Sequence, residues 1–317
     1  MKKRFLILLL LSYALPQVAF AKSQTHQTKS HKVTHKASHK THKALHKASH
    51  KISRSSLSSN ELSPQLASNI ALIFDEQSQR PIYNKNAAQV APIASITKLM
   101  TAMVVLDAMQ PLEDQVTVDI ADLDTLKGTR SKLRIGMSFT RSEMLKLALM
   151  ASENRAASAL ARNYPGGLAA AIAAMNDKAQ ALGMSSTKFY DPTGLNSDNV
   201  STAQDLVKMV AAARNYSLIR QYTTSESHSV DGWGGREMRF NNTNPLVRNA
   251  SWDIGVSKTG FINEAGRCLV MEATINRRPV IIVLLDSWGS RTRVGDANRI
   301  KQWMENSSAL ANIARRG

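Results

Sequence analysis

Hydrophobic and polar residues alternate over short segments near both ends of the chain, which is typical of β-strands. Two apolar stretches, 69–74 and 81–83, flank a polar turn and predict a β-hairpin. Three later segments, 254–259, 268–275 and 280–285, are β-rich and separated by short polar turns, which predicts an antiparallel meander. Strands at both ends with helices between them predict an α+β domain whose sheet joins the two ends.

Helical spacing of apolar residues dominates the middle of the chain, and residues 140–222 are predicted to be mainly helical. Thr140-Arg141-Ser142-Glu143 matches a capping box, in which the threonine and glutamate side chains bind backbone N–H groups at a helix start. Ser201 is the expected N-cap of the helix that follows it. The predicted helices cover residues 95–109, 144–150, 168–182, 202–214 and 293–305.

Residues 1–21 have the pattern of a secretory signal peptide, with basic residues at 2–4, an apolar segment at 5–15 and small residues at the cleavage site. The apolar segment is shorter than the roughly 20 residues that cross a bilayer as a helix, so a retained membrane anchor is less favoured. We therefore expect an exported, periplasmic protein that is soluble or peripherally associated with the envelope. Cys268 is the only cysteine, so no disulfide can form within the chain.

Residues 22–59, the His/Lys tether, are repetitive and strongly basic. The tether contains seven of the eight histidines, and residues 22–54 supply nine of the +17 net charges and no acid. So few apolar residues predict a disordered segment, with the folded domain at 60–317. Two other interpretations stay open: the spaced histidines could bind a metal ion, and the charge could bind anionic envelope polymers. The rest of the chain is mildly basic and has no recognition motif, so nucleic acid is not an expected partner.

The folded domain contains a single histidine, His228, which gives little support for a Ser-His-Asp site. Serines flank His228, and we expect it in a solvated loop. A desolvated lysine can take the place of histidine as a base. Ser95 and Lys98 lie three residues apart at a predicted helix start, so the lysine can reach the serine hydroxyl. The same spacing at 185–188 precedes a poor helix continuation and is interpreted as coincidence.

Two further motifs raise the specificity of this serine and lysine pair. Ser152-Glu153-Asn154 lies between two predicted helices, and Lys258-Thr259-Gly260 lies on the first late strand. The three motifs, in this order, match the signature shared by penicillin-binding proteins and serine β-lactamases, except that Glu153 replaces an aspartate. A chance origin of all three is much less plausible than a chance origin of any one.

Around these motifs, over about residues 67–305, the sequence resembles the low-molecular-mass penicillin-binding proteins of the D-alanyl-D-alanine carboxypeptidase and endopeptidase family. The stretches 92–107, 149–157 and 258–261 resemble the endopeptidase subgroup, the penicillin-binding protein 7 type, particularly closely. The resemblance implies a penicillin-binding transpeptidase fold, with an antiparallel sheet, flanking helices and a mainly helical subdomain. The His/Lys tether is not part of the family's pattern.

The resemblance also implies a catalytic role for each matched residue. Ser95, deprotonated by Lys98, would attack a D-alanyl carbonyl and form an acyl-enzyme. Ser152 would pass a proton to the leaving nitrogen, and the backbone N–H groups of Ser95 and Phe261 would bind the oxyanion.

Binding roles fall to the remaining matched residues. Asn154 would bind the substrate amide, Lys258 and Thr259 would hold the carboxylate of the leaving residue, and Gly260 would leave room for the substrate. The expected partners are peptidoglycan peptides and β-lactam antibiotics. We expect neither a cofactor nor a metal ion in the reaction.

Four functions remain to be weighed. Carboxypeptidases of this family commonly add a β-rich domain and an amphipathic anchor. No such anchor fits after the last predicted helix. A D,D-endopeptidase acting on D-alanyl-diaminopimelyl cross-links is therefore favoured over a D-alanyl-D-alanine carboxypeptidase. A β-lactamase is less favoured, because residues 154–225 contain no glutamate that could speed hydrolysis of the acyl-enzyme. A non-catalytic wall-binding protein is less favoured because all three motifs are intact.

Overall fold

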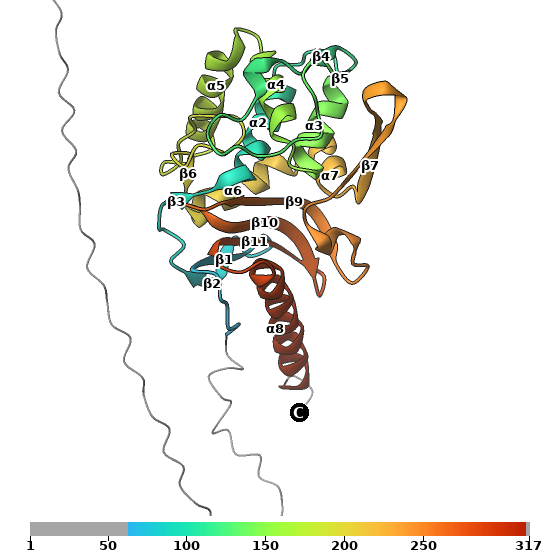
Figure 1. Cartoon of the computed structure of the whole chain (residues 1–317). Coiled ribbons are helices and arrows are strands. Elements are labelled where there is room, and N and C mark those ends of the chain that lie inside the picture. Colours follow the sequence, from blue (N-terminus) through green and yellow to red (C-terminus); the bar gives the residue numbers. More distant parts are fainter. Residues whose placement is uncertain (1–62, 315–317) are drawn as a thin grey trace, which may run out of the picture. The chain divides into compact units, whose positions relative to one another are not determined.

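The computed structural model describes residues 63–314, without the side chains of residues 308–314. Its centre is a five-stranded antiparallel sheet in the order β2-β1-β11-β10-β9 (Figure 1). The strands are β1 (Ile70–Asp75), β2 (Arg80–Lys85), β9 (Asp253–Ile262), β10 (Gly266–Ile275) and β11 (Arg278–Ser287). The predicted hairpin and meander are therefore confirmed, and they share one sheet because β1 pairs with β11.

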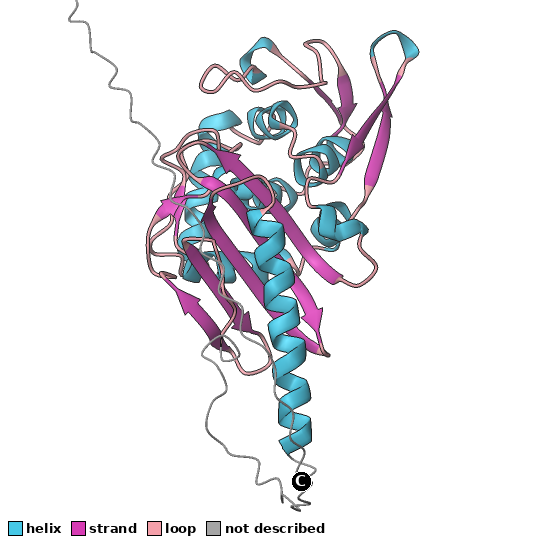
Figure 2. Ribbon diagram, turned by 60° about the horizontal axis from the view of Figure 1, so that its bottom comes forward, coloured by secondary structure: helices cyan, strands magenta, loops and turns pink. Residues whose placement is uncertain are grey.

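The two faces of the sheet carry different layers of helices. On one face, α6 (Ala203–Ala213) and α7 (Ser217–Thr223) contact the strands, and the opposite face packs against α8 (Thr292–Ala314) (Figure 2). The rest of the helical layer packs on α6 and α7 through α2 (Thr97–Asp107) and α3 (Arg141–Met150), and also contains α4 (Asn154–Arg162) and α5 (Gly167–Ala181). Successive strand residues alternate between the two cores. Leu72 and Val283 lie in the core beneath the helical layer, whereas Ala71 and Ile282 lie in the core beneath α8. This is the predicted α+β architecture.

The helix boundaries follow local capping chemistry. Thr140 and Glu143 form the predicted capping box at the start of α3. The prediction for Ser201 is wrong: it lies in β6 (Val200–Ser201), and the hydroxyl of Thr202 caps α6 by accepting the Asp205 N–H. The predicted helix 95–109 is divided into a 3₁₀ turn, η1 (Ala94–Ile96), followed by α2, and the predicted helix 293–305 extends to Ala314 as α8.

A hairpin that the sequence pattern did not indicate projects from the helical layer (Figure 1). It consists of β7 (Ser227–Asp231) and β8 (Glu237–Asn241), joined by η3 (Trp233–Gly235). His228 lies on β7 and not in a solvated loop, and its Nε2 atom is buried without a hydrogen-bond partner. The remaining short elements are β3 (Ala91–Pro92), β4 (Gln115–Thr117), β5 (Ser138–Thr140), η2 (Ile120–Asp122) and η4 (Pro245–Arg248).

The predictions for the signal peptide and the His/Lys tether concern residues that lie outside the described part of the chain. The same is true of the proposed metal-binding histidines and of the exact start of the domain at residue 60. Between residues 63 and 314, no helix is both long enough and apolar enough to cross a membrane.

Candidate active site

Ser95 and Lys98 meet where the 3₁₀ turn η1 passes into α2. The Lys98 ammonium nitrogen, Nζ, lies 2.9 Å from Ser95 Oγ. Lys98 is 1% exposed, so its aliphatic stem and its amine are both out of water. The predicted pair is therefore in direct hydrogen-bond contact, and the competing pair at 185–188 lies outside any helix.

Two further acceptors hold the Lys98 amine. Nζ donates to Asn154 Oδ1 and to the Thr193 carbonyl, each at 2.7 Å. An ammonium group has three hydrogens, and the three acceptors account for all of them. When Lys98 is neutral, its lone pair can instead accept the Ser95 proton, because the other two hydrogens still have partners. The geometry thus allows a proton to pass from Ser95 to Lys98.

Burial lowers the pKa of Lys98 to about 7, although the negative charges of Asp191, Glu153 and Asp124 act in the opposite direction. An ordinary lysine is almost fully protonated at neutral pH, whereas Lys98 is divided between its two forms. A base with a pKa near the working pH can both accept and return a proton.

Lys258 and Ser152 form a second pair facing the same site. Lys258 Nζ, buried on β9, donates to Ser152 Oγ at 2.9 Å and to its neighbour's carbonyl, Thr259 O, at 2.8 Å. Burial lowers the pKa of Lys258 well below its ordinary value, and the charges of Lys98 and Arg293 lower it further.

The strand β9 passes close to the serine. A Cβ atom added to Gly260 would lie 3.0 Å from the Ile93 carbonyl and 3.1 Å from the Ser95 nitrogen, so any side chain here would crowd the backbone around Ser95. Thr259 Oγ1 donates to Thr243 Oγ1 at 2.6 Å. Phe261 is half-exposed and stacks against the Arg267 guanidinium. The strand therefore places Lys258 against Ser152 and Gly260 against the backbone of Ser95, with Thr259 between them.

A polar turn that the sequence analysis did not assign to the site supports it from the opposite side. Thr193 supplies the carbonyl that holds Lys98, and the Asp191 carboxylate fixes this turn by accepting the Thr193 and Gly194 N–H groups. A Cβ added to Gly194 would lie 1.9 Å from the Ala94 carbonyl, so the turn touches the residue before Ser95. Asn199 donates to Thr97 Oγ1 and to Asp191, which ties the turn to the start of α2.

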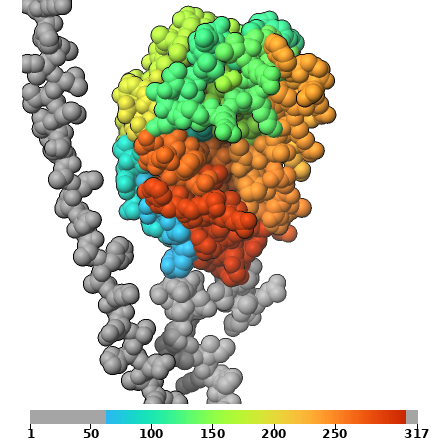
Figure 3. All heavy atoms as spheres, viewed as in Figure 1, coloured from blue at the N-terminus to red at the C-terminus, as the bar shows by residue number. Residues whose placement is uncertain are grey.

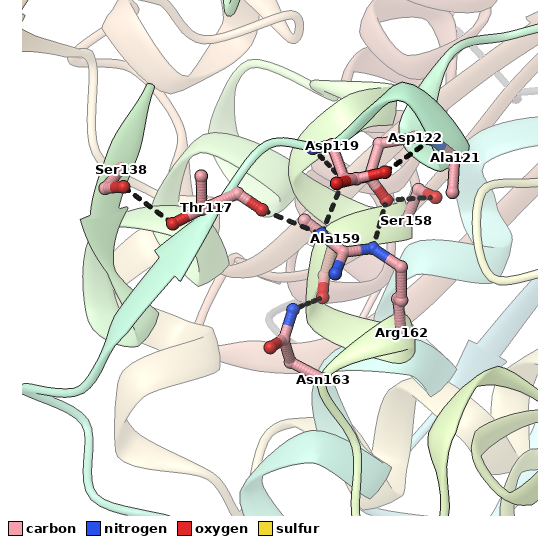
Figure 4. Close-up of polar contacts among 9 residues, drawn as sticks. All are labelled: Thr117, Asp119, Ala121, Asp122, Ser138, Ser158, Ala159, Arg162 and Asn163. Atoms are coloured by element: carbon pink, nitrogen blue, oxygen red, sulfur yellow. Dashed lines mark hydrogen bonds and ion pairs between the residues drawn. The ribbon is translucent and has the colours of Figure 1, made fainter. Parts of the chain in front are cut away.

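The loop from Asp122 to Leu133 closes the site near Asn154. Asn154 Nδ2 donates to Thr129 Oγ1 at 2.9 Å, and the buried Glu153 carboxylate accepts hydrogen bonds from Ser131 Oγ and the Lys132 N–H. At the start of the loop, the Asp122 carboxylate binds Ser158 and Arg162 on α4 (Figure 4). The loop is thus fixed to the helix that carries Asn154.

The seven residues predicted to act through a side chain, or in one case as a glycine, lie in one region, where the helical layer meets β9. They are Ser95, Lys98, Ser152, Asn154, Lys258, Thr259 and Gly260. Figure 3 shows the green helical part and the orange to red strands meeting along a boundary on one face of the molecule. Arg293, on α8, was not predicted; its Nη1 atom donates to the Gly260 carbonyl at 2.7 Å. Arginine at a helix start has no distinctive sequence pattern, so only the fold reveals this contact.

Known proteins share both the sequence and the fold of this chain. The D-alanyl-D-alanine carboxypeptidase family, Peptidase_S11, matches residues 56–289. A protein of Pseudomonas aeruginosa named D-alanyl-D-alanine endopeptidase is 47% identical over 251 residues, covering 79% of this chain and 81% of the relative. An Escherichia coli protein of the same name is 47% identical over 248 residues, covering 78% and 80%.

Among solved structures, the Streptomyces K15 DD-transpeptidase superposes with a TM-score of 0.70 at 29% identity, covering 76% of this chain and 97% of that protein. The penicillin-binding transpeptidase fold predicted from the sequence is therefore confirmed. With the family match extending over most of the chain, this protein belongs to the D-alanyl-D-alanine carboxypeptidase family of peptidases, Peptidase_S11.

Proposed function

We propose that this chain is a serine D,D-endopeptidase that hydrolyses D-alanyl-diaminopimelyl cross-links of peptidoglycan through an acyl-enzyme on Ser95. The observation that carries the proposal is the 2.9 Å contact between Ser95 Oγ and a fully buried lysine amine whose pKa is lowered to about 7. Such an amine can deprotonate the hydroxyl, and the one histidine between residues 63 and 314, His228, lies on β7 and makes no hydrogen bond to Ser95.

The reaction proceeds in two steps. In the first, Lys98 takes the Ser95 proton, the oxygen bonds to the D-alanyl carbonyl carbon, and the backbone N–H groups of Ser95 and Phe261 hold the oxyanion. The C–N bond then breaks, and the proton held by Lys98 passes through Ser152 to the leaving amine, which leaves Lys98 neutral again. In the second step, Lys98 takes a proton from the water that attacks the ester, the ester C–O bond breaks, and Lys98 returns this proton to Ser95 Oγ.

The binding residues orient the substrate for this attack. Lys258 and Thr259 hold the carboxylate beside the scissile amide, and Gly260 lets the substrate lie along β9. Asn154 binds the substrate amide and, through its Oδ1 atom, also positions Lys98. Penicillin carries a carboxylate and a reactive amide in a similar relation, so it acylates Ser95 and inhibits the enzyme.

The choice between endopeptidase and carboxypeptidase rests on the relatives. Two proteins named D-alanyl-D-alanine endopeptidase are 47% identical to this chain over most of its length. The carboxypeptidase activity is the second candidate, because the carboxylate that Lys258 and Thr259 hold is present in both substrates. The deciding experiment is digestion of purified cross-linked and uncross-linked muropeptides, with products identified by mass. Release of D-alanine alone, with no cleavage of cross-links, would favour the carboxypeptidase.

The segments before the domain complete the proposal. Residues 1–21 direct export to the periplasm, and the His/Lys tether at 22–59 holds the catalytic domain, 60–317, near anionic envelope polymers, where cross-link cleavage contributes to cell shape. The support for this role is the charge of the tether, nine basic residues and no acid between 22 and 54.

A deletion tests the tether. Removal of residues 22–58 is expected to leave cleavage of a small soluble cross-linked peptide unchanged and to slow digestion of intact sacculi at low salt, with the difference fading as salt screens the charges. Equal digestion of sacculi by both forms at low salt would make the tether a spacer. Helix formation by the isolated tether on adding zinc at pH 7.5 would support the metal interpretation instead.

A further inference from the structure

A pocket of about 440 Å³ lies next to the Lys258-Thr259-Gly260 motif, because two of its lining residues, Thr243 and Arg293, bind Thr259 and Gly260. This volume is in the range of pockets that bind small ligands, about 300–1,000 Å³. Its walls come from the segment after β8, from the turn after β11 and from the first turns of α8. The residues that matter here are Thr243, Pro245, Arg291, Arg293, Gly295 and Asn298.

The pocket walls are joined to the substrate-binding strand by hydrogen bonds. Thr243 accepts the Thr259 hydroxyl at 2.6 Å, and Arg293 donates to the Gly260 carbonyl at 2.7 Å. Asn244, which precedes Pro245, donates to Ser257 Oγ at 2.8 Å. The pocket is therefore a fixed extension of β9 on the side of the proposed carboxylate-binding residues.

The charge of the pocket favours an anionic ligand. Two arginines line it and no aspartate or glutamate does. The exposed Arg291 side chain makes no hydrogen bond or ion pair with any residue in the described part of the chain, and the buried Nε of Arg293 has no hydrogen-bond partner there. Asn298 uses its Oδ1 atom to accept the Trp252 indole N–H at 3.2 Å, which leaves its N–H₂ group for a ligand.

Gly295 keeps the pocket open. It lies in the first turns of α8, where glycine costs about 1 kcal/mol of helix stability relative to alanine. An added Cβ would meet nothing closer than the Arg299 guanidinium at 3.4 Å, and the backbone does not have a positive φ. Neither packing nor backbone geometry requires glycine at position 295. We therefore interpret the glycine as leaving space in the pocket that it lines.

Building on the proposed cross-link cleavage, we propose that this pocket, the acceptor pocket, binds the acceptor stem peptide, the part of the cross-link that extends beyond the scissile D-alanyl bond. A terminal D-alanine ends at its carboxylate and has nothing to place there. A cross-linked diaminopimelyl residue continues into a peptide with further carboxylates and amides, which Arg291 and Asn298 bind. The acceptor pocket thereby favours cross-linked over uncross-linked substrate.

The test compares three reactions of the full mature protein: cleavage of a purified cross-linked muropeptide dimer, release of D-alanine from a monomeric pentapeptide muropeptide, and acylation by fluorescent penicillin. Arg291→Glu reverses the free charge and Gly295→Leu fills the pocket. Each is expected to lower kcat/KM for the dimer by about tenfold or more, the size of a lost charge-assisted hydrogen bond, while the other two reactions stay within about twofold. Arg80→Glu, on the opposite edge strand β2, is the matched charge control and leaves all three unchanged.

Unchanged dimer cleavage in both pocket variants overturns the acceptor pocket. An equal loss in all three reactions also overturns it, because the pocket would then support the catalytic strand and not the acceptor. If the unaltered enzyme is acylated by penicillin but does not cleave the dimer, the proposed endopeptidase function fails, and the role of the pocket fails with it.

Discussion

Two lysines are buried in the same site, and their surroundings are opposite in charge. Lys98 has three oxygen acceptors within hydrogen-bond distance and three carboxylates, those of Asp191, Glu153 and Asp124, that favour its charged form. Lys258 has one hydroxyl and one carbonyl, and the charges that act on it, those of Lys98 and Arg293, are positive.

The difference suits the two lysines to the two roles that we propose for them. Carboxylates partly offset the burial of Lys98, so its pKa stays at about 7 and it can act as a base. Within residues 63–314, the charges that act on Lys258 are positive, so the substrate carboxylate that we propose it binds would be the group that stabilises a charge there. We expect the two to be coupled, because a charge on Lys258 favours the neutral, basic form of Lys98.

Among variants that keep the nucleophile Ser95, the largest expected effect is that of Lys98→Ala. Loss of a general base is expected to slow penicillin acylation by roughly 10²- to 10⁴-fold at neutral pH. The rate is measured from a time course of labelling with fluorescent penicillin. Ser95→Ala is the control and should show no covalent label at all. Labelling of Lys98→Ala at the rate of the unaltered enzyme would exclude Lys98 as the base.

Lys258→Gln comes next. Removing a charge that binds the substrate carboxylate should lower kcat/KM for the cross-linked dimer by about 10- to 100-fold, the range for hydrogen bonds to charged groups. The reaction should persist, because Ser95 and Lys98 are intact. A loss as large as that of Lys98→Ala would mean that the two lysines do not have separate roles.

The pH dependence of acylation sharpens the comparison further. Lys98 is active when neutral, so the rate should rise about tenfold per pH unit at acid pH and level off above a midpoint near 7. Glu153→Gln removes a negative charge that raises the pKa of Lys98, so the midpoint should move to lower pH. A midpoint that stays in place or moves to higher pH in Glu153→Gln would contradict the electrostatic account.

The smallest expected effect is that of His228→Ala. His228 lies on β7, and the charges that act on it are those of Lys146 and Glu143 on α3, not those of the catalytic residues. Acylation and dimer cleavage should both stay within about twofold of the unaltered enzyme. A loss greater than that of Lys258→Gln would return a histidine base to consideration.

Contacts in the site could be predicted from the sequence when the two residues are close together in the chain, and were missed when they are far apart. The Ser95 and Lys98 contact spans three residues on one helical turn, so local geometry was enough. The Thr193 carbonyl and Arg293 were missed, because every residue has a carbonyl and an arginine at a helix start has no distinctive pattern. The Asp-Pro-Thr-Gly turn at 191–194 is a recognisable turn sequence, but its contact with Lys98 spans 95 residues.

The fold followed the same rule. The apolar strands of the central sheet and the Thr140 capping box were predicted, because each has a strong local pattern. The β7–β8 hairpin was missed because it is mostly polar, with Val230 and Phe240 as its buried apolar residues. Ser201 was chosen as a cap over Thr202, and two adjacent residues with similar capping ability cannot be separated by pattern alone.

The order of strands in the sheet has a consequence for how the chain reaches its native state. Between residues 63 and 314, β1 is the first strand and pairs with β11, the last, so that Ile70 lies opposite Leu285. Pairing of segments so far apart in sequence is slow, because a long loop must close before any contact forms. The central sheet cannot be completed during synthesis until β11 has emerged from the ribosome, so the nascent chain stays without its native sheet until most of it has been made.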